Sequence, residues 1–246
     1  MGTEGDAMPV GMSPVRPQRL VFFTGAGMSA ESGVPTFRGK GGLWKDYDYE
    51  RYACQPAFDR DPEAVWEFHN YRRKLVSACL PHDGHRMIRV AEEQLDQVTI
   101  VTQNIDGMHQ LAGSASVLEL HGSLWRLRCE ECGATHEGRE SPLSSLKCDC
   151  GSYWRPAIVW FGDALDAATI EASAETIAQC DCLVSIGTSA VVYPAAQLPL
   201  LAERNGARLI EINPEPTPMS DAYHEHLRGP ASEMLAQLAE RWGLES

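Results

Sequence analysis

The chain has 246 residues and a formal net charge of −13, from 34 acidic and 21 basic side chains. This length suits one α/β domain with a small insertion, and the acidic balance disfavours nucleic acid as a partner, because phosphate contacts require clustered Lys and Arg. No apolar run is long enough to cross a bilayer, and residues 1–17 lack the apolar region of a signal peptide. We therefore expect a cytoplasmic protein with a disordered tail at 1–17 and no membrane partner.

The first structural signal is the apolar run Leu20–Phe23, which is followed at once by the glycine-rich turn Thr24–Gly27. The run is typical of a buried parallel strand, and Met28–Ser32 resembles the first turns of a helix. This order favours nucleotide binding, because glycine lets the backbone approach a pyrophosphate and the free amides of a helix N-terminus attract its charge. A plain tight turn is the alternative. Ala30 stands where the dinucleotide fingerprint often has a third glycine.

The next segments alternate between helical and strand patterns. We predict helices at Asp61–Ala78 and His82–Leu95, and short buried strands at Val98–Val101 and Val117–Leu120. The first of these strands delivers the run TQNIDGMH, residues 102–109, at its carboxyl end, which is where open parallel sheets bind ligands. Asn and Asp can hold a ribose, a water or an amide there, although they also form common turns.

Four cysteines form two close pairs, each followed by glycine. Cys129-x-x-Cys132 opens the motif and Cys148-x-Cys150 closes it. The pattern predicts tetrahedral zinc held by four thiolates, which makes the metal structural because no position stays open for a substrate. The closing pair is one residue shorter than the usual spacing, and reactive or redox thiols are the alternative.

The remainder of the chain again alternates strands and helices. We predict strands at Ile158–Phe161, Cys182–Ile186 and Arg208–Ile212, and helices at Asp166–Gln179, Gln197–Asn205 and Ser232–Trp242 with Ser232 as the cap. Cys180 and Cys182 are expected to be core thiols. Gly187, Thr188 and Ser189, at the end of a predicted strand, can hold the hydroxyls or phosphates of a cofactor.

Two separated motifs resemble the signatures of one family. GAGMSAESGVPTFRG, residues 25–39, is similar to the first signature of the sirtuins, the NAD-dependent protein-lysine deacylases, and TQNIDGMH is similar to the second. The resemblance covers nearly everything after residue 17. It implies an α/β catalytic domain at 18–246: a Rossmann-like parallel sheet with helices on both faces (about 18–45, 83–125 and 156–246), an inserted helical module (about 46–82) and a zinc module (about 126–155).

The resemblance also implies a reaction. The acyl oxygen attacks the ribose carbon that carries nicotinamide, and His121 acts as general base on a ribose hydroxyl, although a lone histidine at a strand end is more often structural. The products are free lysine, nicotinamide and O-acyl-ADP-ribose. Phe37 would shield the ribose, Arg38 and Asn104 would position cofactor and water, and Asp106 would hold the nicotinamide amide. The implied cofactor-binding residues are Gly25, Ala26, Gly27, Ser29, Phe37, Arg38, Trp44, Gln103, Asn104, Ile105, Asp106, Gly187, Thr188, Ser189, Asn213, Pro214, Glu215 and Ala231.

The implied substrate is an acyl-lysine in a protein or peptide. By resemblance, the edge of Ile158–Phe161 pairs with the peptide through main-chain hydrogen bonds, opposite residues 191–194. An ordinary core strand is the alternative. The substrate-binding residues are then Val159, Phe161, Gly162, Val192 and Tyr193, with His69 and Arg72 at the acyl group.

His69 and Arg72 bear on which acyl group is removed. Sirtuins that remove succinyl and malonyl groups carry Tyr-x-x-Arg on the corresponding helix, and here His69 stands at the tyrosine position while Arg72 keeps the arginine. Residues three apart share a helix face and can meet one carboxylate. We therefore expect deacetylation beside reduced desuccinylation or demalonylation, with a succinyl preference that rises as His69 becomes protonated toward pH 6. A solvated helix face is the alternative.

Two other functions stay open at this level. One is an ADP-ribosyltransferase on the same scaffold, and the other is a non-catalytic module that binds NAD or ADP-ribose. His121, Asn104 and Asp106 argue against the second. We expect a monomer that uses NAD and holds one structural zinc per chain.

Overall fold

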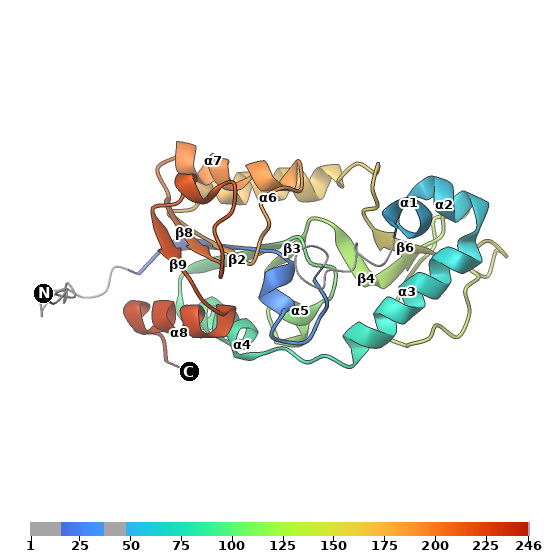
Figure 1. The fold of residues 1–246 in the computed structure, drawn as a ribbon, viewed down its shortest axis with the longest axis horizontal. Coiled ribbons are helices and arrows are strands. Elements are labelled where there is room, and N and C mark those ends of the chain that lie inside the picture. Colours follow the sequence, from blue (N-terminus) through green and yellow to red (C-terminus); the bar gives the residue numbers. More distant parts are fainter. Residues whose placement is uncertain (1–15, 37–47, 246) are drawn as a thin grey trace, which may run out of the picture.

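A parallel sheet of six strands forms the centre of the larger part of the molecule (Figure 1). The structure is a computed structural model and describes residues 16–36 and 48–245. The strands are β1 (Arg19–Thr24), β2 (Gln97–Thr102), β3 (Val117–Glu119), β7 (Cys182–Ile186), β8 (Arg208–Ile212) and β9 (Glu225–Leu227). Their order is β3-β2-β1-β7-β8-β9, and every neighbouring pair is parallel. The predicted strands of this sheet are therefore confirmed to within two residues, and β9 is an additional short strand.

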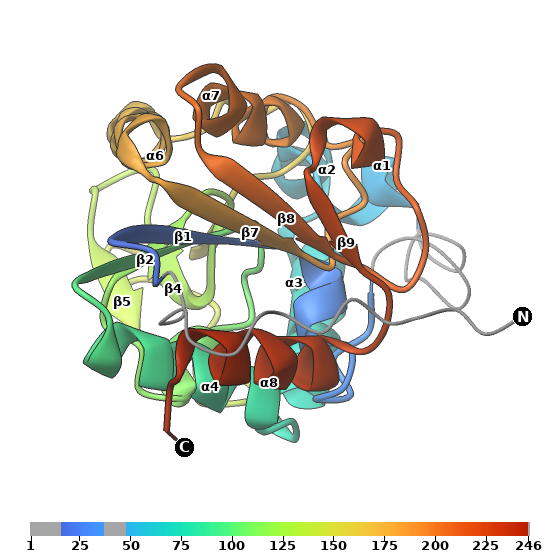
Figure 2. The ribbon, with the colours of Figure 1, turned by 90° about the vertical axis from the view of Figure 1, so that its left-hand side faces the viewer.

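Helices cover both faces of the sheet. In Figure 2, α4 (Asp83–Gln94) and α8 (Ala231–Trp242) lie side by side under one face, and α6 (Ala167–Gln179) and α7 (Pro199–Arg204) lie over the other. Burial of the apolar stripes of α4 and α8 against Phe22 and its neighbours fixes the first layer. Ile177 and Leu209 belong to the matching core under α6 and α7.

The strand order reverses between β1 and β7. From β1 the chain proceeds outward to β2 and β3, and from β7 it proceeds in the other direction to β8 and β9. In open parallel sheets, the carboxyl ends of the strands at such a reversal form the crevice that binds ligands. Thr24, Thr102 and Ile186, which are paired in register at the ends of β1, β2 and β7, mark this edge.

A smaller part of the molecule lies beyond the carboxyl edge of the sheet. It contains the antiparallel strands β4 (Gly122–Arg128), β5 (Thr135–Glu137) and β6 (Arg155–Ile158), in the order β5-β4-β6. Helices α1 (Tyr49–Tyr52), α2 (Gln55–Arg60) and α3 (Pro62–Ser77) pack with these strands (Figure 1). A core that includes Trp66, Trp125 and Trp160 joins the helices to the strands. The remaining short helices are η1 (Ala26–Ser29), α5 (Met108–Leu111), η3 (Ala195–Gln197) and η4 (Ser220–Ala222).

Two local expectations near the crevice are wrong. The segment Met28–Ser32 is not the start of an α-helix: η1 ends at Ser29, and Val34 N–H donates back to the Ser29 carbonyl to close a turn. The predicted strand Ile158–Phe161 ends at its first residue. There the backbone N–H groups take other partners, since Trp160 N donates to Asp163 Oδ2 at 3.0 Å and Phe161 N donates to Ala53 O at 3.0 Å.

Two helix boundaries also differ from the expectation. The predicted helix Gln197–Asn205 is divided into η3 and α7, because Pro199 has no N–H and can only begin a helix. Ser232 does not cap α8, whose capping position is Pro230. Instead, Ser232 N and Oγ donate to the Glu31 carboxylate at 3.0 and 2.5 Å, so a distant side chain satisfies this helix end. No helix in the described parts of the chain is both long and apolar enough to cross a membrane.

Candidate active site

The glycine-rich turn packs its backbone directly against the loop that follows β7. Gly27 N donates to Gly187 O at 2.9 Å, and Gly25 N donates to Ile186 O at 2.9 Å. A Cβ at Gly27 would stand 2.6 Å from Gly187 Cα, and a Cβ at Gly187 would stand 2.4 Å from Met28 N. Both positions therefore require glycine. The result is a backbone surface without side chains at the reversal of the sheet, which suits the close approach of a pyrophosphate.

A pocket adjoins this turn and combines residues of both parts of the molecule. Its lining residues are Ala26, Val34, Pro35, Arg72, Val76, Asn104, Ile105, Asp106 and Leu124. Four of the predicted cofactor residues thus meet Arg72, which was assigned to the acyl group. The predicted residues Phe37, Arg38 and Trp44 lie outside the described residues.

Asn104 and Asp106 are buried in the loop that follows β2. Asn104 Nδ2 donates to Gly25 O at 2.9 Å, and its backbone N donates to Thr102 Oγ1 at 3.0 Å. Asp106 Oδ1 accepts from Met108 N at 2.9 Å. Burial raises the pKa of Asp106, while the Met108 N–H, the Ser29 hydroxyl and the charges of Arg72 and Arg139 lower it.

His121 stands between β3 and β4, with one ring nitrogen fixed by the backbone. Its Nδ1 lies 2.9 Å from Gln103 O. Since a carbonyl only accepts hydrogen bonds, Nδ1 carries the proton and Nε2 is the basic nitrogen. Burial lowers the pKa of His121, and the hydrogen bond to Gln103 opposes that shift. A neutral imidazole of this tautomer can accept a proton at neutral pH.

His69 and Arg72 share α3 but have different surroundings. Arg72 is nearly buried, lines the pocket with Asp106 and has its pKa lowered to about 10 by burial, so it stays charged at neutral pH. His69 is fully buried, and its Nε2 accepts from Trp160 Nε1 at 3.3 Å. Burial, followed by the charge of Arg72, lowers the pKa of His69 well below its usual value. The expectation that His69 becomes protonated toward pH 6 is therefore wrong.

The residues predicted to bind the peptide lie on two partly exposed segments. Phe161 is 40% exposed and packs against Tyr49 with ring centroids 4.4 Å apart, while Gly162 follows it with φ +90°. Val159 N donates to His121 O at 3.0 Å, which ties this segment to the predicted general base. On the second segment, Val192 is half-buried and Tyr193 is 65% exposed.

Asn213 connects the loops after β7 and β8. Its Nδ2 donates to Thr188 O at 2.8 Å, so the predicted residues Thr188 and Asn213 are adjacent at the same edge of the sheet. Pro214, Glu215 and Ser189 are exposed, and Ala231 is buried as the first residue of α8.

Sequence reasoning missed a buried polar network beneath the glycine-rich turn. Thr24 Oγ1 donates to Thr102 Oγ1 at 2.8 Å and lies 3.0 Å from His109 Nε2. Ser29 Oγ, which is fully buried, lies 3.5 Å from His85 Nε2. His109 thus has a packing and hydrogen-bonding role beneath the turn. The two threonines face each other in the register of β1 and β2, and only knowledge of that register would have paired them.

The four cysteines of the two pairs converge on one point. Their Sγ atoms all lie within 4.8 Å of one another, with Cys129 and Cys150 at 3.5 Å and Cys132 and Cys148 at 3.6 Å. Tetrahedral zinc–thiolate bonds of about 2.3 Å place sulfurs about 3.8 Å apart, so the cluster fits zinc.

The closing pair, Cys148 and Cys150, is followed by a turn of the same geometry as the turn after the opening pair, Cys129 and Cys132. Gly133 and Gly151 both have positive φ, and each donates its N–H to the carbonyl of the first cysteine of its pair, Cys129 and Cys148.

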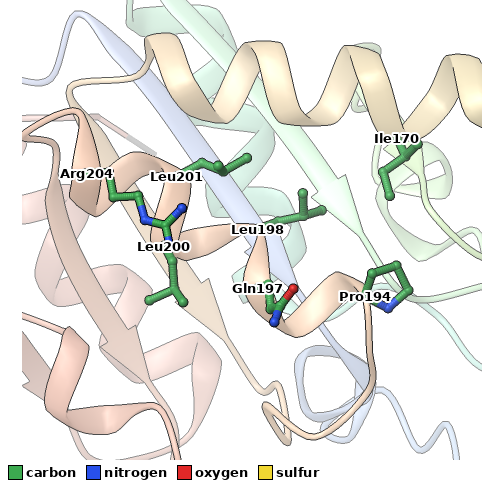
Figure 3. A pocket seen from close by; sticks show the side chains of 7 residues that line it. All are labelled: Ile170, Pro194, Gln197, Leu198, Leu200, Leu201 and Arg204. Atoms are coloured by element: carbon green, nitrogen blue, oxygen red, sulfur yellow. The ribbon is translucent and has the colours of Figure 1, made fainter.

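A second pocket lies on the outer surface between α6 and α7 (Figure 3). Its lining residues are Ile170, Pro194, Gln197, Leu198, Leu200, Leu201 and Arg204. Only Pro194 among them belongs to a predicted site segment, residues 191–194, and the convergent polar groups lie instead at the crevice.

The crevice and the cysteine cluster define a class of protein: a Rossmann-like nucleotide-binding domain that carries a structural zinc module. Comparison with known proteins gives the family. Residues 25–194 match the sequence profile of the Sir2 family. The chain is 43% identical over 231 residues to the NAD-dependent protein deacylase of Aquifex aeolicus, covering 91% of this chain and 97% of the relative. It is 45% identical over 228 residues to that of Aeropyrum pernix, covering 92% and 93%.

Solved structures agree with the sequence relatives. A Sir2 homologue bound to ADP-ribose superposes with a TM-score of 0.90 at 40% identity, covering 94% of both chains. A Sir2 homologue bound to NAD has a TM-score of 0.87 at 40% identity, covering 94% of this chain and 91% of the other. This chain belongs to the Sir2 family. It is an NAD-dependent protein deacylase, and its four-cysteine cluster is consistent with structural zinc.

Proposed function

We propose that this deacylase removes acetyl groups from lysine side chains of proteins, and succinyl and malonyl groups less efficiently. The acyl group passes to ADP-ribose with release of nicotinamide, and one water molecule is consumed when the free lysine is released. Structures of relatives bound to 2'-O-acetyl-ADP-ribose and to a p53 peptide with NAD support this class of substrate and product. The observation in this chain that carries the acyl assignment is Arg72, a charged side chain in the pocket that also contains Asn104 and Asp106.

The residues present fit NAD. Gly27 and Gly187 pack backbone against backbone where any Cβ would collide, and such a side-chain-free turn suits the approach of a pyrophosphate. Thr188 and Asn213, which are joined by a hydrogen bond, would contact the adenosine half, and Asn104 and Asp106, which line one pocket, would contact the nicotinamide half. Bound NAD supplies an activated ribose carbon to which the acyl oxygen can bond.

The chain's own residues would orient the ribose and a water and would deprotonate a ribose hydroxyl. Asn104, whose Nδ2 is held by Gly25 O, presents its amide oxygen to a ribose hydroxyl or a water. His121 Nε2 accepts the proton of a ribose hydroxyl, because Nδ1 is engaged with Gln103 O.

Arg72 alone would bind the carboxylate of an acidic acyl group, without a hydrogen bond from His69. The Trp160 indole N–H already occupies His69 Nε2, so this nitrogen has no proton to offer a carboxylate. The negative charge of Asp106 near Arg72 also reduces the attraction that remains for a second anion. Both effects support a reduced, but retained, activity on succinyl-lysine.

The test compares acetyl- and succinyl-lysine peptides of one sequence. We expect Arg72→Met to lower kcat/KM for the succinyl peptide about 10- to 100-fold more than for the acetyl peptide, as loss of a charge-assisted hydrogen bond implies. Lys74→Met removes one positive charge from the exposed face of the same helix and should leave the ratio unchanged. An unchanged ratio in Arg72→Met would leave a plain deacetylase.

The same incubations distinguish the alternatives. Mass spectrometry of an acyl-peptide mixed with NAD detects the loss of the acyl group from the peptide and O-acyl-ADP-ribose in solution. A peptide or protein that gains ADP-ribose would favour the transferase, and no change in either would favour a binding module.

A further inference from the structure

The segment between the two cysteine pairs meets the active-site loop beside Trp125, a residue of β4 that contacts both. Trp125 lies on β4, is nearly buried, and donates from Nε1 to Asp106 O at 2.6 Å. Two guanidinium groups lie over its ring: Arg73 Cζ at 4.9 Å and Arg139 Cζ at 4.7 Å from the ring centroid. Arg73 comes from α3, and Arg139 comes from the segment that joins Cys132 to Cys148.

Arg73 fixes the backbone on both sides of residue 139. It is fully buried, and its Nη2 donates to Gly138 O and Glu140 O, each at 2.7 Å, while Nη1 donates to Leu124 O at 2.5 Å. Because both flanking carbonyls are held, the side chain between them starts from a fixed place. The position of Arg139 is thus set by the fold rather than by its own surface contacts.

From that place Arg139 reaches the loop that follows β2. Its Nη2 donates to Gly107 O at 3.0 Å, next to the Asp106 carbonyl that Trp125 holds. The approach is so close that a Cβ at Gly107 would stand 2.5 Å from Arg139 Nη2. The charge of Arg139 also helps to keep Asp106 ionised against the effect of burial on the pKa of that carboxyl.

We propose that Arg139 is a positioning residue, through which the zinc-binding module holds the Asp106–Gly107 loop in the geometry that binds the nicotinamide end of NAD. Arg139 and Trp125 hold consecutive carbonyls of that loop, and Asp106 lines the pocket from it. The proposal rests on the assignment of Asp106 to the nicotinamide amide, made under the proposed function. It extends that assignment to a residue outside the crevice.

The experiment uses the full-length, zinc-loaded enzyme and two ligands that differ by nicotinamide. We expect Arg139→Gln to raise the KM for NAD about threefold to tenfold, as loss of a partly exposed, charge-assisted hydrogen bond implies, and to raise the concentration of nicotinamide needed for half-inhibition by a similar factor. The Kd of ADP-ribose, which has no nicotinamide, should stay within twofold of wild type. Arg139→Lys keeps the charge but not the planar group over the ring, so its effect should be intermediate.

Arg128→Gln is the matched control. It removes the same charge from the same module, where Arg128 is exposed and pairs with Glu130 at 3.2 Å. It should leave the KM for NAD, the half-inhibitory concentration of nicotinamide and the Kd of ADP-ribose unchanged. Since Arg139 is exposed, its variants should fold and bind zinc as wild type does. The proposal is overturned if Arg139→Gln matches Arg128→Gln, or if it weakens ADP-ribose as much as NAD. If wild type itself binds neither nicotinamide nor NAD, the assignment of Asp106 is at fault.

Discussion

His121 illustrates how one backbone contact prepares a side chain for chemistry. A histidine is useful as a base only when the correct nitrogen is unprotonated, and the Gln103 carbonyl at 2.9 Å settles this before any ligand arrives. Gln103 N in turn donates to Thr24 O at 2.9 Å. The tautomer of this proposed base therefore depends on the same strand end that begins the glycine-rich turn.

Replacing this imidazole should separate binding from turnover. We expect His121→Ala to lower kcat about 10²- to 10⁴-fold, the usual contribution of a general base, with little change in the Kd of NAD because His121 does not line the glycine-rich turn. Steady-state kinetics and calorimetric titration measure the two quantities. His136→Ala, which removes an exposed histidine of β5, is the control. Wild-type turnover in His121→Ala would remove His121 from the mechanism.

His69 leads to an expectation about pH that differs from the one based on sequence. Because its pKa is far below the usual value, His69 remains neutral as the pH falls from 7.5 to 6. The ratio of succinyl to acetyl kcat/KM should therefore stay flat across this range, since Arg72 is fully charged throughout. If the ratio rises toward pH 6 in wild type and this rise is absent in His69→Phe, the His69 ring titrates in this range.

At the scale of elements, most apolar runs and several helix boundaries were predictable from local chemistry. Strands β7 and β8 have the predicted bounds, and α3 begins after Asp61, whose side chain accepts from Ala64 N at 3.0 Å, with Pro62 as its first residue. The run Ile158–Phe161 is equally apolar but ends its strand early. There a distant carbonyl, that of Ala53, takes a backbone donor, and no local pattern reveals such a partner.

The residues of the candidate site also fall into those that local sequence predicts and those that only the fold reveals. Its glycines, Asn104, Asp106 and the cysteines follow from motifs, because their chemistry is carried by residues close in sequence. Arg139 is 33 residues from Asp106 in the chain, and its role arises only from the folding of β4 against the loop. The hydrogen bond that His69 accepts likewise comes from Trp160, which is 91 residues away.

The zinc module should depend on all four thiolates for its fold. Between β4 and β6, the core of this module is small, so metal binding contributes folding energy directly. We expect Cys129→Ala to abolish the zinc content of one per chain, measured by elemental analysis, and to give an unstable or insoluble product. Cys54→Ala, which removes a half-buried thiol outside the cluster, should retain the metal and remain soluble. A folded Cys129→Ala protein without zinc would make the metal dispensable.

For the whole molecule, buried histidines should make stability depend on pH. His69, His85 and His109 are almost completely buried. Burial lowers the pKa of His85 to about 2 and of His109 to about 3, and it lowers that of His69 well below the usual value. In the unfolded chain each takes up a proton near pH 6.5, whereas the native state does not. The unfolded state therefore gains protons as the pH falls below 6.5, and stability is progressively lost on that side.

Lowering the pH from 7.5 to 5.5 should cost about 4 kcal/mol of unfolding free energy, or roughly 8–16 °C in Tm, from these three histidines together. The raised pKa values of the buried carboxyls Asp106 and Glu119 act in the opposite direction, whereas the lowered pKa of His121 adds to the loss, so this figure describes the three histidines alone. His109→Gln, which keeps a polar group near Thr24 Oγ1, isolates the effect: it should reduce the pH-dependent loss by about one third relative to wild type, and His136→Gln should not. Urea unfolding at the two pH values measures both. An equal loss in wild type and His109→Gln would mean that His109 takes up its proton in the native state, against the burial that surrounds it.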